Sequence, residues 1–176
     1  VEIIGDIPRV YFNNSGDRLK LMTIENFGNY ALGSNSQQNA FYGCSNMVIN
    51  ATDVGFFDDV TDFLFAFRDC SSLTSFPLID TSNGTDFTGA WRDCSSLTSF
   101  PLIDTSSGVD FRAAWRFCSS LTSFPLLDTS NGTDFITAFE DCSSLTSFPL
   151  IDTSNGTDFT GAWRSCSSLT SFPLID

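Results

Sequence analysis

The chain has 176 residues, 41% of them hydrophobic, and its 21 acidic side chains against 8 basic ones give a net charge of −13. This length fits one domain with an apolar core, and the strong negative charge disfavours nucleic acid and anionic membrane surfaces as partners. No stretch approaches the run of about 18 apolar residues that a membrane-spanning helix needs, so we expect no membrane insertion.

Residues 1–40 are not repetitive, and we expect them to cap the N-terminal end of the array that follows. The turn-forming residues Asn13–Gly16 separate short apolar stretches, which is typical of strands joined by tight turns. The predicted strands are Val1–Ile4, Arg9–Phe12 and Leu19–Ile24.

Residues 41–69 form a diverged first repeat, and residues 70–176 repeat one 24-residue sequence four and a half times. The regular unit reads CSSLTSFPLIDTSNGTDFTGAWRD and restarts at Cys70, Cys94, Cys118, Cys142 and Cys166. A fixed period of this length is typical of solenoids, in which each unit buries its apolar face only by stacking on its neighbours. The array stops at Asp176 inside a repeat, so we expect the polypeptide to continue.

The first half of each unit predicts a short strand. Leu73, Phe76 and Leu78 follow L-x-x-L-x-L spacing, with Phe76 and Leu78 alternating as expected for one inward face. Pro77 lies between them and cannot donate to a ladder, so the predicted parallel sheet is short or partly irregular.

The second half of each unit predicts a turn and then a short helix. Residues 80–84 are turn formers, and Thr85 or Asp86 can cap a helix. Spacing of i, i+3, i+4 and i+7 then defines one apolar helical face, formed by Phe87, Ala90, Trp91 and Cys94. The same phase makes Trp91, Trp115 and Trp163 core residues, with a sugar-stacking platform as the alternative.

The six cysteines are predicted to form a column of buried, reduced thiols: Cys44, Cys70, Cys94, Cys118, Cys142 and Cys166. Equivalent residues in stacked repeats would lie about 4.8 Å apart with parallel side chains, whereas a disulfide needs convergent ones. The chain has no His and no CxxC pair, so we expect no zinc site.

Two columns of aspartates are the sharpest chemical feature. The first contains Asp80, Asp104, Asp128, Asp152 and Asp176, and the second contains Asp86, Asp110, Asp134 and Asp158. We interpret the first column as Asx-turns and the second as helix caps. Calcium bound by Asp80, Asp104, Asp128 and Asp152 is one alternative, and it would be the only cofactor. A carboxylate pair for glycoside hydrolysis is another, although a uniform column lacks the required asymmetry.

Several motifs resemble BspA-like leucine-rich repeats, in particular the bacterial-surface-protein 26-residue repeats. They are the L-x-x-L-x-L segment Leu73–Leu78, the segment Asp80-Thr81-Ser82-Asn83, and Ala90–Leu97, with a matching leader at Ala40–Met47. The period of 24 and the Trp at positions 91, 115 and 163 depart from the family pattern. The resemblance implies a leucine-rich-repeat-like α/β solenoid with an N-terminal cap, located outside the cell on a bacterial or virion surface.

The resemblance further implies adhesion or host recognition, and no catalytic residue is predicted. Because core columns cannot vary, we expect recognition to use the outward positions, namely Thr74, Ser75, Pro77, Ile79 and their equivalents. The partner would be a cell-surface glycan, a protein or a neighbouring copy. A structural spacer or fibre, and a polysaccharide-processing domain, are the alternatives.

In the third copy Val109, Arg112 and Phe117 depart from their equivalents in the sibling copies, next to Arg116, which Arg92 and Arg164 match. This patch of Val109, Arg112, Arg116 and Phe117 indicates either drift or a local contact with a partner chain.

Overall fold

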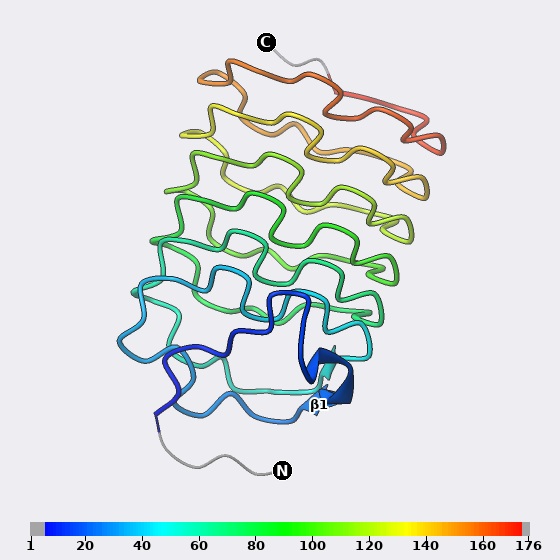
Figure 1. Cartoon of the computed structure of the whole chain (residues 1–176). Helices are drawn as coiled ribbons and strands as arrows, with labels where there is room; N and C mark the ends of the chain where they lie inside the picture. Colours follow the sequence, from blue (N-terminus) through cyan, green and yellow to red (C-terminus); the bar gives the residue numbers. More distant parts are fainter. Residues whose placement is uncertain (1–5, 174–176) are drawn as a thin grey trace.

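A computed structural model describes residues 6–173 of the chain. The repeats wind as successive coils that lie one above another between the two ends of the chain (Figure 1). Single parallel β-bridges join equivalent residues of neighbouring coils in one column, through Ser36, Asp62, Asp86, Asp110, Asp134 and Asp158. The leucine-rich-repeat class stays a prediction, because regular strands and helices are almost absent from the described coils.

Three short regular elements are present in residues 6–173, and all lie near the N-terminal end: the 3-10 helix η1 (Arg18–Lys20) and the strands β1 (Thr23–Ile24) and β2 (Val48–Ile49). β1 and β2 pair in parallel with Thr23 opposite Val48. The predicted strand Leu19–Ile24 is therefore reduced to β1, and Arg9–Phe12 forms no strand. The predicted strand Val1–Ile4 lies outside the described residues.

The segment predicted as a helix is a run of turns. Gly89 (φ 56°) and Asp93 (φ 62°) adopt the left-handed conformation, which a right-handed helix excludes. Alternate N–H groups then bond in different directions: Ala90 donates three residues back, to the Phe87 carbonyl, whereas Trp91 donates to Ala114 in the next coil. Half of the hydrogen bonds that a helix would close internally therefore join neighbouring coils.

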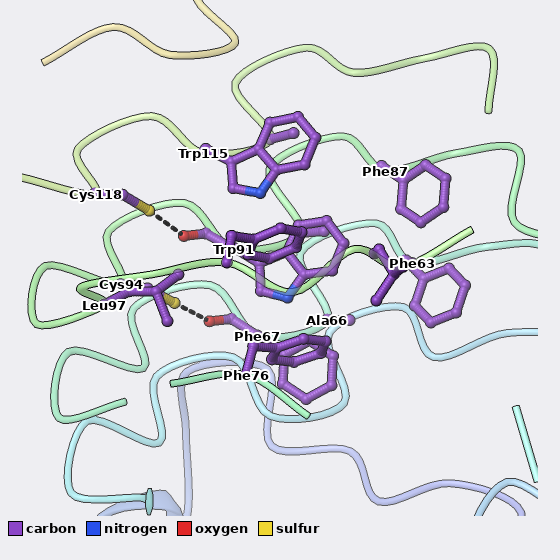
Figure 2. Packing of buried hydrophobic residues seen from close by; sticks show 14 of the residues in the cluster. Phe63, Ala66, Phe67, Phe76, Phe87, Trp91, Cys94, Leu97, Trp115 and Cys118 are labelled. Atoms are coloured by element: carbon purple, nitrogen blue, oxygen red, sulfur yellow. Dashed lines mark hydrogen bonds between the residues drawn. The ribbon is translucent and has the colours of Figure 1, made fainter. Parts of the chain in front are cut away.

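The inward phase of this segment is nevertheless as predicted. Phe87, Ala90, Trp91 and Cys94 are all fully buried. Equivalent rings stack in nearly parallel planes along the coils. The centroids are 5.5 Å apart for Phe87 and Phe111, and also for Trp91 and Trp115 (Figure 2). The core is thus a set of continuous side-chain columns rather than one helical face per repeat.

The segment 73–78, predicted as a strand, forms no regular strand, and Leu78 and Ile79 exchange sides relative to the prediction. Leu78, expected inside, is 60% exposed, and Ile79, expected outside, is 2% exposed. The Ile79 N–H donates to the Pro77 carbonyl at 3.0 Å, which closes a three-residue γ-turn centred on Leu78. This turn ends the alternation of an extended strand, so the phase shifts by one residue in every coil.

The N-terminal segment packs on the first coils. The N–H groups of Phe12 and Asn13 donate to the carbonyls of Ala40 and Asn39 at 3.0 and 3.1 Å. Its apolar side chains, with those of Phe27, Tyr30 and Phe41, line a hollow of about 170 Å³. The capping role of residues 1–40, the diverged repeat 41–69 and the array 70–176 stay predictions about domain organisation.

Candidate recognition surface

The predicted recognition residues lie on one side of each coil. Thr74 and Ser75 are exposed, Pro77 is half-buried, and Ile79 belongs to the core instead. Both the N–H and the hydroxyl of Thr98 donate to the Thr74 carbonyl, at 3.1 and 3.2 Å. The same double contact recurs at Thr122, Thr146 and Thr170. Because their hydroxyl hydrogens are engaged, these threonines offer methyl groups and acceptor lone pairs to a partner.

Sequence reasoning missed the leucines on this surface. Each is the apex of a γ-turn, and the four are 60–63% exposed: Leu78, Leu102, Leu126 and Leu150. The Pro-Leu dipeptide in each copy could have indicated these exposed leucines, because Pro cannot donate to a strand ladder and so favours a turn at the next residue. We call these four residues the leucine stripe.

The first aspartate column flanks the leucine stripe and forms Asx-turns, as predicted. The Asp80 Oδ1 accepts the Ser82 N–H at 2.9 Å, and Asp104, Asp128 and Asp152 accept equivalent bonds. These bonds favour the charged form, so the pKa of Asp80 and that of Asp152 lie below the usual value. We call Asp80, Asp104, Asp128 and Asp152 the aspartate stripe; Asp176 lies outside the described residues.

The second aspartate column is bonded in a similar local way, without a helix to cap. The Asp86 Oδ1 accepts the Thr88 N–H at 2.8 Å. At Asp158, hydrogen bonds from the Thr160 side chain and N–H lower the pKa of the carboxyl. The helix-cap interpretation of this column is therefore wrong, because the residues that follow form turns.

The calcium alternative gains no support from the geometry. Across residues 6–173, no group of three or more acidic, His or Cys side chains is arranged to hold a metal ion. The aspartate stripe supplies one carboxylate per coil, and its Oδ1 is already engaged by a backbone N–H. Calcium needs six to eight oxygen ligands, which one such column does not gather at one point.

The cysteines are free, as predicted, and all are buried except the half-buried Cys166. Each buried thiol of the regular array points at a carbonyl of the preceding coil: Cys94 Sγ lies 3.2 Å from the Phe67 oxygen, and Cys118 Sγ lies 3.3 Å from that of Trp91 (Figure 2). Burial raises the pKa of Cys44 to about 12 and holds that of Cys118 well above its usual value. These thiols are structural rather than nucleophilic.

Arg112, Arg116 and Phe117 of the third copy contact other residues of the chain. Arg112 pairs with Asp110 at 2.5 Å and with Asp134 at 3.6 Å. The Arg116 guanidinium lies 4.5 Å from the centre of the Phe117 ring, which is a cation–π contact. These contacts lie within the chain and do not test the predicted contact with a partner chain, which stays a prediction.

Glu140 provides the acidic partner that Phe117 removes from Arg116. Arg92 pairs with the following Asp93 at 3.1 Å, but Phe117 deprives Arg116 of such a neighbour. Glu140, 2% exposed, contacts Arg116 at 2.7 Å and also pairs with Arg164, which is followed by Ser165 instead of an acid. One carboxylate therefore serves two arginines from neighbouring coils, a relation invisible to motif reading.

The tryptophans are core residues in the middle of the array. Trp91 and Trp115 are buried, and only Trp163, near the C-terminal end, is half-buried. A sugar-stacking platform needs exposed ring faces, so Trp91 and Trp115 do not provide one.

The chain matches no protein-family model, no curated protein and no solved structure. The resemblance to leucine-rich repeats therefore depends on the sequence motifs alone. Of the helices in residues 6–173, none has the length and hydropathy to cross a membrane.

Proposed function

We propose that this chain is a non-enzymatic recognition module that binds a repetitive partner on a cell or virion surface. The observation that carries the proposal is the recurrence of one exposed set of side chains in each coil. Thr74, Ser75, Leu78 and Asp80 represent this set, and the exposure of the leucine changes only from 60% to 63% between copies.

The spacing of these sets is uniform, which suits multivalent contact. The Phe76, Phe100, Phe124 and Phe148 rings, two positions before the leucines, stack with centroids 5.7–5.8 Å apart. Identical weak sites on one rigid core can gain roughly 10²–10⁴ in avidity when a partner engages them together. A cell-surface polymer or an ordered protein array has the matching repetition.

The two alternatives draw on different observations. The continuous buried core would also suit a structural spacer, which needs no exposed binding face. A polysaccharide-processing enzyme would need one carboxyl that stays protonated beside one that is ionised. Asp80 and Asp152 instead make the same kind of contact with a serine, which lowers the pKa of both carboxyls, so the observations favour a structural role for this column.

Removing coils one at a time tests the proposal. Variants lacking one, two or three 24-residue units would be compared with the full chain for binding to a glycan array and to fixed bacterial cells. We expect affinity for the recognised surface to fall with each coil removed. Binding that stays constant with coil number would overturn the multivalent proposal, and no binding by any variant would favour the spacer.

A further inference from the structure

The leucine stripe and the aspartate stripe lie side by side on the same surface. In each coil the exposed leucine and the exposed aspartate are two residues apart, with only the buried residue represented by Ile79 between them. Single exposed leucines are ordinary, but four in one column at the coil spacing make a continuous apolar surface feature. A soluble protein exposes such a feature most often where a partner covers it.

The aspartate stripe is not paired with basic side chains. None of the salt bridges within 4.0 Å in residues 6–173 involves Asp80, Asp104, Asp128 or Asp152. The lowered pKa of Asp80 and Asp152 keeps these carboxylates ionised, and none of the hydrogen bonds described above occupies Oδ2. A positively charged partner would therefore meet a row of carboxylates that form no salt bridge with the described residues of this chain.

Part of the backbone next to the stripes also makes no backbone–backbone bond to a neighbouring coil. No backbone–backbone hydrogen bond joins the ranges 75–80, 99–104 and 123–128 of neighbouring coils. The one backbone–backbone bond within each range is the γ-turn, for example from Ile103 N–H to the Pro101 carbonyl. The carbonyls of Asp104 and Asp128 accept the hydroxyls of Thr81 and Thr105, so the free peptide groups are those of the residues before them. Toward the C-terminal end, residues 150–154 line an open hollow of about 320 Å³ that includes Leu150 and Asp152. Peptide groups and a side-chain recess are what a docked polypeptide uses.

We propose that the two stripes dock an extended polypeptide segment of a partner protein, in which apolar and basic side chains are interspersed. This inference deepens the proposed function and rests on it. Basic side chains reach the aspartate stripe while apolar ones cover the leucines. Aliphatic leucines and engaged threonine hydroxyls suit a polypeptide better than a glycan. A second copy of this chain would bring another row of carboxylates, so like charge disfavours it.

Short peptides provide the probe. Fluorescence anisotropy would measure the binding of the full chain to a labelled peptide of alternating Lys and Leu, and to matched Lys-Ser and Glu-Leu peptides. We expect the Lys-Leu peptide to bind at least tenfold more tightly than either control peptide. We also expect its affinity to fall as salt rises, because the carboxylates are exposed.

Variants assign the binding to the stripes. Replacing Leu102 and Leu126 by Ser, or Asp104 and Asp128 by Asn, should each weaken Lys-Leu binding at least tenfold. Asn retains the acceptor oxygen of the Asx-turn, so the second pair removes charge without removing the turn. Matched controls remove exposed apolar or acidic groups elsewhere and should change binding less than twofold: Val109→Ser, and Asp58→Asn with Asp59→Asn.

Unchanged Lys-Leu binding by both stripe variants would overturn the inference. Competition by a soluble glycan, or a dimer that the leucine variant abolishes in light scattering, would assign the stripes to another occupant and would also overturn it. If the stripe variants bind fixed cells normally while coil removal still weakens that binding, this inference fails and the proposed function stands. If coil number has no effect, the proposed function fails.

Discussion

A cysteine in each regular coil acts as a small apolar residue with one satisfied donor. The Phe67 carbonyl accepts the Cys70 N–H at 3.3 Å and the Cys94 thiol, from the next coil, at 3.2 Å. The thiol therefore adds an inter-coil contact without placing an unpaired polar group in the core. A serine at Cys118 would find the same acceptor in the Trp91 carbonyl, although its shorter bond would lengthen the contact.

The buried thiols should make the fold sensitive to alkali. Their folded-state pKa exceeds the unfolded value of about 9, reaching about 12 for Cys44, so stability is complete below pH 9 and falls as pH rises toward the folded pKa. Each such thiol contributes about 1.4 kcal/mol per pH unit in that window. Urea midpoints measured under reductant at pH 7, 9 and 10 should drop steeply.

Burial also raises the pKa of Tyr30, which would add to the same pH dependence. Cysteine variants therefore separate the contribution of the thiols from that of Tyr30. Replacing Cys118 and Cys142 by Ala should make the pH dependence above 9 shallower, while replacing the half-buried Cys166 should change it least. If the unfolding free energy of the wild-type protein, the Cys118 and Cys142 variant and the Cys166 variant fell equally with pH, the pH dependence would not come from the buried thiols.

One place in the repeat has a left-handed backbone, which favours glycine. Two copies have glycine there, Gly89 and Gly161, whereas the other two have Ala113 (φ 52°) and Thr137 (φ 53°). A β-branched residue is strained there, so Thr137→Gly should raise the free energy of unfolding by about 0.5–1 kcal/mol. Thermal unfolding checks this, with Thr133→Gly as a control at a position without positive φ. A lower melting temperature for Thr137→Gly would show that side-chain contacts outweigh the strain.

Neighbouring coils are joined by turn segments whose hydrogen bonds alternate between local and inter-coil acceptors. This arrangement places the same side chain of each copy in one column, which stacks aromatic rings favourably but also stacks like charges. The Arg92 and Asp93 columns reduce this repulsion by lying next to each other. Phe117 takes the place of an acidic residue in the column of Asp93, and Glu140 takes the place of an arginine in the column of Arg92. Glu140 thus gives Arg116 an acidic partner.

Glu140→Gln should therefore destabilise the array locally. It leaves Arg116 and Arg164 without a carboxylate, and we expect a loss of about 1–3 kcal/mol in the free energy of unfolding from urea titration. Arg112→Gln removes a more exposed ion pair and should cost under about 1 kcal/mol. Adding Phe117→Asp to Glu140→Gln should recover part of the loss by giving Arg116 the neighbour that Arg92 has. A double variant no more stable than Glu140→Gln would refute this compensation.

At the level of the whole molecule, stability should depend on the number of stacked coils. Each inner coil contributes one ring to every aromatic column, as Trp115 does between Trp91 and Phe139, at 5.5 and 5.0 Å. The predicted solenoid class further implies that each interface contributes nearly independently. The chain should then tolerate the loss of a complete unit better than a change of phase.

Deleting residues 94–117 should preserve the fold, because Asp93 then joins Cys118 in the original register. Deleting residues 106–117 should disrupt it, because inward and outward positions of later coils no longer match. Circular dichroism and urea unfolding compare the two. Equal loss of structure in both deletants would show that the coils do not stack as equivalent units.

The repeat period and the identity of the apolar residues determined which positions are buried in the second half of each unit. Phe87, Trp91 and Cys94 were predicted inside because an apolar residue at one place in every copy has only its equivalents to pack against. The Asx-turns of the aspartate stripe also followed from local chemistry, since an aspartate carboxylate readily accepts the N–H two residues on.

The tertiary structure alone decided the local conformation and the surface. Spacing of i, i+3, i+4 and i+7 fits both a helix and a run of turns, and the carbonyls of the next coil selected the turns by accepting alternate N–H groups. The γ-turn after Pro77 placed Leu78 outside and Ile79 inside, against strand alternation. The pairing of Glu140 with two arginines required residues 24 positions apart to become neighbours, which occurs only when the coils stack.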